Sequence, residues 1–252
     1  MEGRVIDEGV SRLLPEGAWP YVAGLLSEHR VVVRLSRPRR TKLGDHRSPS
    51  RGVGHHRISV NDDLNPYAFL MTLLHEIAHM TTWEKLRQRF RRYPPHGREW
   101  KREFERILVP VVAGGMLPAD VEQAVAVSMR DPAAATCSDR RLLLALSRYD
   151  REEPGRRRLE ELASGCVFRV DSGQVFRMGP RLRSRYQCFE LATGREYRVH
   201  SLSRVEPLAD GAAEAGESAA GRGRSTGGRP GGGRRCRRSG AAGSDASRSA
   251  CS

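Results

Sequence analysis

Residues 74–83, LHEIAHMTTW, place two histidines and a glutamate inside an otherwise apolar run. A helix that only built a core would carry apolar side chains here, because a buried polar group costs free energy unless it is paired. Residues four apart on a helix share one face, at about 40° and ~6 Å, so His75 and His79 can bind a single zinc ion. Glu76 lies roughly 100° round the helix, where it can hold a water molecule on the metal. The stretch therefore predicts a metal-binding helix with a carboxylate beside the metal.

This is the HExxH pattern of zinc peptidases, in which the glutamate is the general base and zinc needs a third protein ligand. One candidate is His96, in a turn where two prolines stiffen its approach and a glycine follows it. Glu99 and Glu103, on the helix predicted next, are the alternatives. Three ligands would leave one zinc position open for water, as in catalytic sites. The other histidines are expected to be solvated or core residues: His29, His46, His55, His56 and His200.

Residues 10–150 are expected to form an α+β domain around this helix. Asn65 followed by Pro66 is typical of a helix start, since asparagine caps a helix and proline suits its first turn. RISV at 57–60 is the candidate edge strand along which a substrate would lie. The hydrophobic patterns predict strands over 31–36 and 57–60, joined by a hairpin connection or flap, and helices over 15–30, 66–90, 97–112, 117–131 and 138–150.

Residues 159–208 have a different texture, with short strands separated by DSG, GP and ATG. This spacing predicts a small β-barrel-like module of four or five strands. Three arginines, Arg181, Arg183 and Arg185, alternate along one predicted strand, so they would share a face at ~7 Å intervals. Together with Arg177 and Arg198 they are either a phosphate-binding row or a solvated charged face. Residues 209–252 are rich in Gly, Ala, Ser and Arg and are expected to be a disordered tail.

The composition bears on partners and compartment. The net charge of +14 suggests a nucleic-acid partner, although only 3 of the 44 basic residues are lysine, a bias that genomic base composition can produce. Five cysteines without a CxxC pair argue against a disulfide framework or a thiolate zinc site. No apolar run is long enough for a membrane helix, and the first residues lack a secretory signal, so a soluble cytoplasmic protein is expected. The oligomeric state is left open.

LHEIAHMTTW followed by PPHGREWKREF resembles the SprT-like zinc metallopeptidases, whose pattern is HExxH and then HGxxF or HGxxW. The likeness covers roughly residues 10–207, including RTKLGDHR at 40–47, and is greatest to the bacterial branch with a small C-terminal β module. It implies a zincin-like fold, one zinc ion on His75, His79 and His96, and Glu76 as the catalytic base. The zinc ribbon of other members is missing here, so a second zinc is not expected.

The resemblance extends to the Spartan-type proteases that remove DNA–protein crosslinks. It therefore implies a metalloendopeptidase that acts on DNA-bound or crosslinked proteins during DNA repair. Two other functions stay open: a general peptidase without DNA dependence, and a non-proteolytic zinc protein that binds nucleic acid. The presence of Glu76 argues against the second of these, because a purely structural metal site has no use for a base beside the metal.

Overall fold

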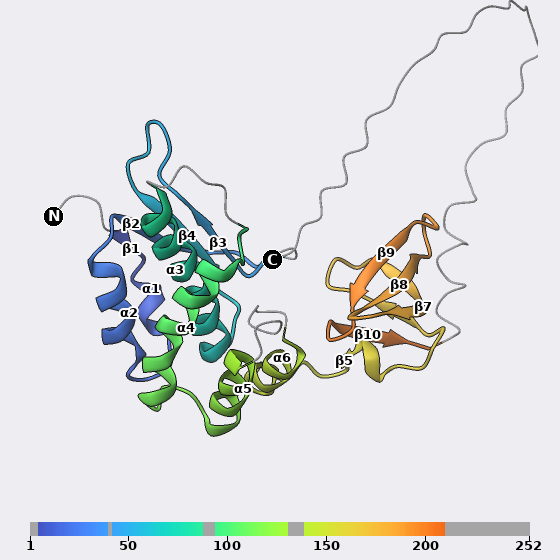
Figure 1. The fold of residues 1–252 in the computed structure, drawn as a ribbon. Coiled ribbons are helices and arrows are strands. Elements are labelled where there is room, and N and C mark those ends of the chain that lie inside the picture. The colour runs from blue at the N-terminus through green and yellow to red at the C-terminus, as the bar shows by residue number, and fades with distance from the viewer. Residues whose placement is uncertain (1–4, 40–41, 88–93, 131–138, 210–252) are drawn as a thin grey trace, which may run out of the picture. The chain divides into compact units, whose positions relative to one another are not determined.

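The computed structural model describes residues 5–39, 42–87, 94–130 and 139–209. These residues form a mixed α+β protein with two sheets, divided after Arg151 into two compact units (Figure 1). In the described ranges, no helix combines the length and the apolar character needed to cross a lipid bilayer. The predicted disordered tail lies, from residue 210 onward, outside the described residues.

The first unit contains a four-stranded sheet and six helices among its described residues. Its elements are β1 (Val5–Ile6), α1 (Gly9–Arg12), α2 (Ala18–Ser27), β2 (Val31–Ser36), β3 (Gly44–Arg47), β4 (His56–Asn61), α3 (Pro66–Leu86), α4 (Arg98–Ala113), α5 (Ala119–Arg130) and α6 (Arg140–Leu146). The helices predicted from hydrophobic periodicity are all present, with ends that differ by a few residues from those expected.

The sheet has the order β1-β2-β4-β3, in which β2 and β4 are parallel and β3 is antiparallel to β4. The predicted hairpin between β2 and β4 is therefore wrong, because parallel neighbours need a crossover rather than a tight turn. The expected edge strand is also wrong. RISV belongs to β4, which is paired on both sides, and β3 occupies the edge of the described sheet. The short strand GDHR lies inside the segment that was expected to be only a connection, and its lack of apolar residues hid it.

The helix that carries the motif, α3, is central to this unit. The Asn65 side chain accepts hydrogen bonds from the backbone N–H groups of Tyr67 and Ala68, and Pro66 occupies the first turn, as predicted. The helix packs against α2, α4, β3 and β4 (Figure 1). Its apolar side chains are fully buried on several faces, among them Leu70, Leu73, Leu74 and Ile77. Such a helix cannot shift without disturbing the core, so it holds the motif rigidly.

The second unit is an antiparallel sheet with the order β5-β10-β6-β7-β8-β9. Its small core contains Leu159, Phe168, Phe176, Met178 and Val205. The module was expected to have four or five strands, and its described residues form six. They are β5 (Arg157–Arg158), β6 (Val167–Arg169), β7 (Val175–Leu182), β8 (Arg185–Glu190), β9 (Glu196–His200) and β10 (Arg204–Leu208).

Candidate metal centre

Three imidazoles meet at one point of the first unit. His75 and His79 lie on successive turns of α3, and their Nε2 atoms are 3.1 Å apart. His96 precedes α4, in a turn closed by a hydrogen bond from the backbone N–H of Gly97 to the carbonyl of Pro94 (2.9 Å). Its Nε2 atom lies 3.1 Å from each of the other two. The structure therefore brings the three predicted ligands together, and all three are partly buried.

The two alternative ligands lie outside this group. Glu99 is exposed in the first turn of α4. Glu103 faces the protein, but its carboxylate is engaged by Lys85 and by Arg106 (3.2 Å). In the described part of the chain, His75, His79 and His96 are the group of side chains whose ligand atoms lie close enough together to hold a metal ion.

Hydrogen bonds between the rings cannot account for all three contacts. In a neutral imidazole, Nε2 is either a donor or an acceptor and never both. Of three Nε2 atoms at least two must therefore be in the same state, and two donors or two acceptors repel each other at 3.1 Å. A cation removes the conflict, because all three nitrogens can direct their lone pairs towards it. A metal ion bound at this point would account for the convergence of the three nitrogens, which hydrogen bonding alone does not.

The spacing of the nitrogens fits zinc. A tetrahedral zinc ion at about 2.0–2.1 Å from each nitrogen would set them about 3.3–3.4 Å apart. The observed separations of 3.1 Å are close to this value. Three histidines leave a fourth position, and imidazole donors with one open position are the ligand set of catalytic zinc sites.

The three imidazoles are held in the neutral form that binds metals. Burial lowers the pKa of His75 to about 3 and that of His79 to about 4, and it also lowers the pKa of His96. The neighbouring rings also lower the pKa of His75 and His79, because a proton on one ring disfavours a proton on the next, and the charge of Lys101 also lowers the pKa of His96. Trp100, fully buried, packs its ring against all three, with centroid separations of 4.6–5.3 Å.

Glu76 lies between α3 and the edge strand β3. Its side chain is buried, and burial raises the pKa of the carboxyl to about 8 in the metal-free protein. The charge of Asp45 adds to this rise, whereas Lys42, Arg39 and a hydrogen bond from the backbone N–H of His46 oppose it. A carboxyl whose pKa is close to neutral pH can both take up and release a proton there, which suits a general acid and base.

Gly44 of β3 makes the position of Glu76 possible. A Cβ atom at residue 44 would lie 2.6 Å from Glu76 Oε1, 2.8 Å from its Cγ and 2.9 Å from Thr72 Cγ2. Real Cβ atoms essentially never approach other atoms so closely, so only glycine lets β3 and the carboxylate share this space. A lone glycine in LGD gives no sign of this role in the sequence, because the role depends on the register of β3.

In a site where Glu76 acts as the base of a hydrolysis, Gly44→Ala should lower the rate about 10–100-fold, because a displacement of about 1 Å in a catalytic group can cost as much. The zinc content should be unchanged, because no metal ligand moves. The measurements are kcat/KM on an unfolded protein substrate and the zinc-to-protein ratio. Gly54→Ala is the matched control, since a Cβ at residue 54 meets no atom within 4 Å. Equal activity in the two variants would show that the close approach of residue 44 is immaterial.

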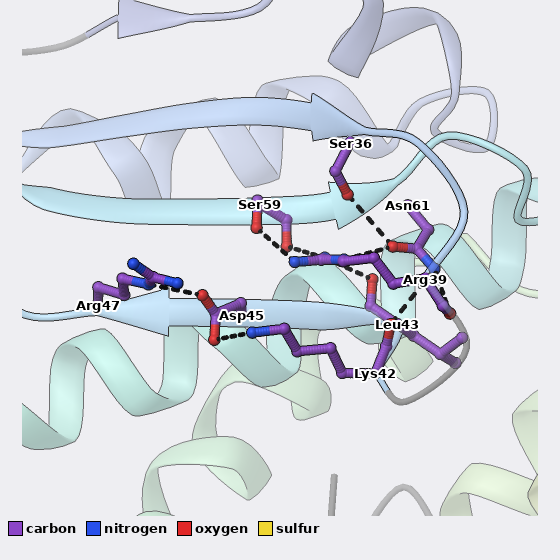
Figure 2. A network of polar contacts seen from close by, with 8 residues as sticks. All are labelled: Ser36, Arg39, Lys42, Leu43, Asp45, Arg47, Ser59 and Asn61. Carbon is purple, nitrogen blue, oxygen red and sulfur yellow. Dashed lines mark hydrogen bonds and ion pairs between the residues drawn. The ribbon is translucent and has the colours of Figure 1, made fainter.

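Arg39 and Asn61 set the position of β3 (Figure 2). The guanidinium of Arg39 donates to the side-chain oxygen of Asn61 (2.8 Å) and to the hydroxyl and carbonyl oxygens of Ser59 (3.0 and 3.2 Å). The backbone N–H of Asn61 donates to the carbonyl of Leu43 (2.9 Å), directly before β3. These contacts tie the start of β3 to β4 and so fix Gly44 against α3.

A second set of histidines lies beside the metal centre. Nε2 of His46 is 2.9 Å from Nδ1 of His56, and Nε2 of His56 is 2.7 Å from the Glu84 carboxylate. An ionised carboxylate only accepts, so His56 donates from Nε2 and accepts at Nδ1 from His46. Burial lowers the pKa of both rings, that of His46 to about 3. These histidines were expected to be ordinary solvated or core residues. Their hydrogen bonds could not be predicted, because only the pairing of β3 with β4 brings the two rings together.

The predicted arginine row of the second unit is wrong. Gly179–Pro180, expected as a turn, is where the register of β7 shifts, and β7 continues to Leu182. Arg181 therefore ends up on β7, Arg183 in the turn with φ 53°, and Arg185 on β8. Because Arg181 pairs with Tyr186 whereas Leu182 pairs with Arg185, Arg181 and Arg185 face opposite sides of the hairpin.

A smaller group of the predicted arginines does share a face. Arg177 is paired with Phe189, Arg198 with Gln187, and Arg185 lies two residues before Gln187 on β8. Side chains of paired residues and of alternate residues point to the same side of a sheet. Arg177, Arg185 and Arg198 thus lie on one face with Phe189, which is 39% exposed. Their binding of phosphates stays a prediction.

The raised pKa of Glu76 has a consequence for stability in the absence of metal. Between its ordinary pKa of 4.5 and about 8, the carboxyl is protonated in the folded state and ionised in the unfolded state. The folded state then binds more protons, so this group makes stability fall as pH rises through the window. Glutamine cannot ionise, so the stability of Glu76→Gln relative to the native chain should rise by about 4 kcal/mol between pH 5 and pH 9.

Urea unfolding of both chains with a chelator, at pH 5, 7 and 9, measures this difference. The histidines are common to both proteins, so their protonation largely cancels in the comparison. A difference in the free energy of unfolding that does not change with pH would contradict the raised pKa.

Comparison with protein-family models, curated proteins and solved structures finds no match to this chain. The distinguishing features of the site are its three converging neutral imidazoles and the buried carboxyl beside them.

Proposed function

We propose that the chain is a zinc-dependent metalloendopeptidase of the SprT-like, zincin-like type. One observation carries the proposal: the Nε2 atoms of His75, His79 and His96 lie 3.1 Å from one another, next to the buried carboxyl of Glu76. The sequence resemblance points to the same residues.

His75, His79 and His96 would hold the zinc ion through their Nε2 atoms. A zinc ion held there supplies Lewis acidity, which lowers the pKa of a water molecule towards about 7 and polarises a carbonyl group. Glu76 orients that water and takes its proton on a carboxylate oxygen as the peptide carbonyl is attacked. The same carboxyl then donates the proton to the leaving amine nitrogen, so the base is regenerated in each cycle.

The edge strand β3 is the proposed binding place for the substrate backbone. An extended peptide can add to an exposed strand edge through main-chain hydrogen bonds, which are independent of its sequence. Gly44 and His46 of β3 lie beside Glu76, so a peptide paired there would pass the proposed base. This mode of binding favours unfolded or extended segments as substrates.

The test is hydrolysis of an unfolded protein by the zinc-loaded chain, with and without DNA, and with Glu76→Gln as the control. Cleavage that requires zinc and Glu76 supports the peptidase. Faster cleavage with DNA present supports DNA-bound substrates, whereas an equal rate favours a general peptidase. Full zinc occupancy with no cleavage in either condition would contradict the proposal.

A further inference from the structure

The other face of the four-stranded sheet gathers arginines. Val33, Ile58 and Val60 point to the buried core. Alternate residues point the opposite way, and the register places Arg47 of β3 directly opposite Arg57 of β4. The same face carries Arg34 of β2, and Arg39 lies across its end. We call Arg34, Arg39, Arg47 and Arg57 the arginine face.

These charges are poorly compensated within the protein. Like charges on directly opposite residues of a sheet destabilise it. Asp45 is the one acid among the residues that line this face, and it already binds Lys42 (2.6 Å) and Arg47 (2.9 Å) (Figure 2). In the described part of the chain, Arg34 and Arg57 have no ion-pair partner.

Arg39 adds charge without compensation as well. Its guanidinium contacts only the neutral side chains of Asn61 and Ser59 and two backbone carbonyls (Figure 2). The arginine face therefore holds four positive charges against one negative charge. Such a surface is stabilised by an anion from outside.

A cavity of about 450 Å³ lies on this face, and the four arginines line it together with Asp45, His55, Ser59 and the apolar Val32, Val53 and Ile58. Ligand sites have volumes of about 300–1,000 Å³, so the cavity can admit a phosphate with its attached sugar or base. Arginine is the side chain best suited to phosphate, because its planar fork makes two parallel hydrogen bonds.

We propose that the arginine face binds the phosphodiester backbone of a nucleic acid. A nucleic acid presents several phosphates along its backbone, and the guanidinium groups that could contact them come from three neighbouring strands and the segment after β2. β3 belongs to both places: Gly44 and His46 face the metal centre, whereas Asp45 and Arg47 lie on the arginine face. The inference extends the proposed function, because it assigns the DNA that carries the substrates to the arginine face. It does not depend on the hydrolytic step.

The experiment measures the binding of labelled single-stranded and duplex DNA oligonucleotides to the full zinc-loaded Glu76→Gln chain by fluorescence anisotropy. Using this chain separates binding from hydrolysis, so a failed peptidase assay leaves the result intact. In that background, Arg34→Ser with Arg57→Ser should weaken binding about tenfold near 0.1 M salt and reduce the salt slope by about 1.5, as expected for two lost phosphate contacts. Short-peptide hydrolysis by the same pair of substitutions in the otherwise native chain should be unchanged.

Arg12→Ser with Arg102→Ser is the matched control, because these exposed arginines give the same charge change on α1 and α4. This control should bind DNA within about twofold of the parent. Equal losses in both double variants would reduce the effect to net charge and overturn the proposal. So would an undiminished affinity after removal of Arg34 and Arg57.

Two further arms identify the ligand and the surface. Competition by pyrophosphate or polyglutamate as effective as that by DNA would make the face a general anion site and overturn the assignment. A loss of binding in Arg177→Ser with Arg198→Ser, and none in Arg34→Ser with Arg57→Ser, would move the contact to the second unit and also overturn it. Circular dichroism and zinc content establish that each variant is folded.

Discussion

Glu76→Gln is expected to lower kcat for peptide hydrolysis by at least about 1,000-fold, within the range that general-base catalysis contributes. Glutamine has nearly the same shape, but its amide cannot accept a proton from water. The three imidazoles do not depend on this side chain, so zinc should remain bound at one ion per chain. The decisive measurements are kcat on an unfolded protein and the metal content of the same preparation.

Glu103→Gln provides the matched control. This glutamate is also partly buried near the site, but its carboxylate pairs with Lys85 and Arg106 instead of facing the base position. Its loss should cost stability and leave kcat within a few-fold of the native value. A Glu76→Gln enzyme that hydrolyses the substrate at the native rate would remove the proposed role of this residue.

His96→Ala is expected to reduce zinc affinity by more than about 100-fold. Loss of a residue that only hydrogen-bonds to a metal ligand typically lowers metal affinity about 10–100-fold, and loss of the ligand itself should lower it more. Its Nε2 atom is one of three that converge, and nearby acids cannot replace it, since Glu99 is exposed and Glu103 is occupied. Competition titration with a zinc indicator measures the affinity, and hydrolysis should disappear along with the metal.

His55→Ala is the control, because His55 lines the opposite face of the sheet. It should bind zinc as the native chain does. Native zinc affinity in His96→Ala would mean that a carboxylate or a solvent ligand suffices as the third partner, and Glu99→Ala and Glu103→Ala would then identify it.

The helices and the position of the histidines could be predicted because local signals determine them. Asn65 and Pro66 mark the start of α3, and a spacing of four residues places His75 and His79 on one face whatever surrounds them. The third ligand could not be chosen from local signals, which left His96, Glu99 and Glu103 as candidates. In the structure, His96 converges with the other two histidines and the two glutamates do not.

Features that depend on strand pairing could not be predicted. The strand β3 has almost no apolar residue, so its sequence resembles a polar connection and does not predict a strand. Without β3, the strand β4 would be the edge of the sheet. Gly44 matters because it lies against Glu76, which is 32 positions away in the sequence. His46 contacts His56 only because of the register in which β3 pairs with β4. The arginine row failed for a related reason, since a bulge at Gly179–Pro180 moved the turn and separated Arg181 from Arg185.

The most direct test of the central claim is X-ray absorption at the zinc edge of the purified chain loaded with one equivalent of zinc. The structure predicts three nitrogen ligands from imidazole at about 2.0–2.1 Å, one light-atom ligand in the fourth position and no sulfur. His96→Ala should show one imidazole fewer at any residual metal. A shell with sulfur at about 2.3 Å, or a full imidazole shell in His96→Ala, would contradict the three-histidine centre.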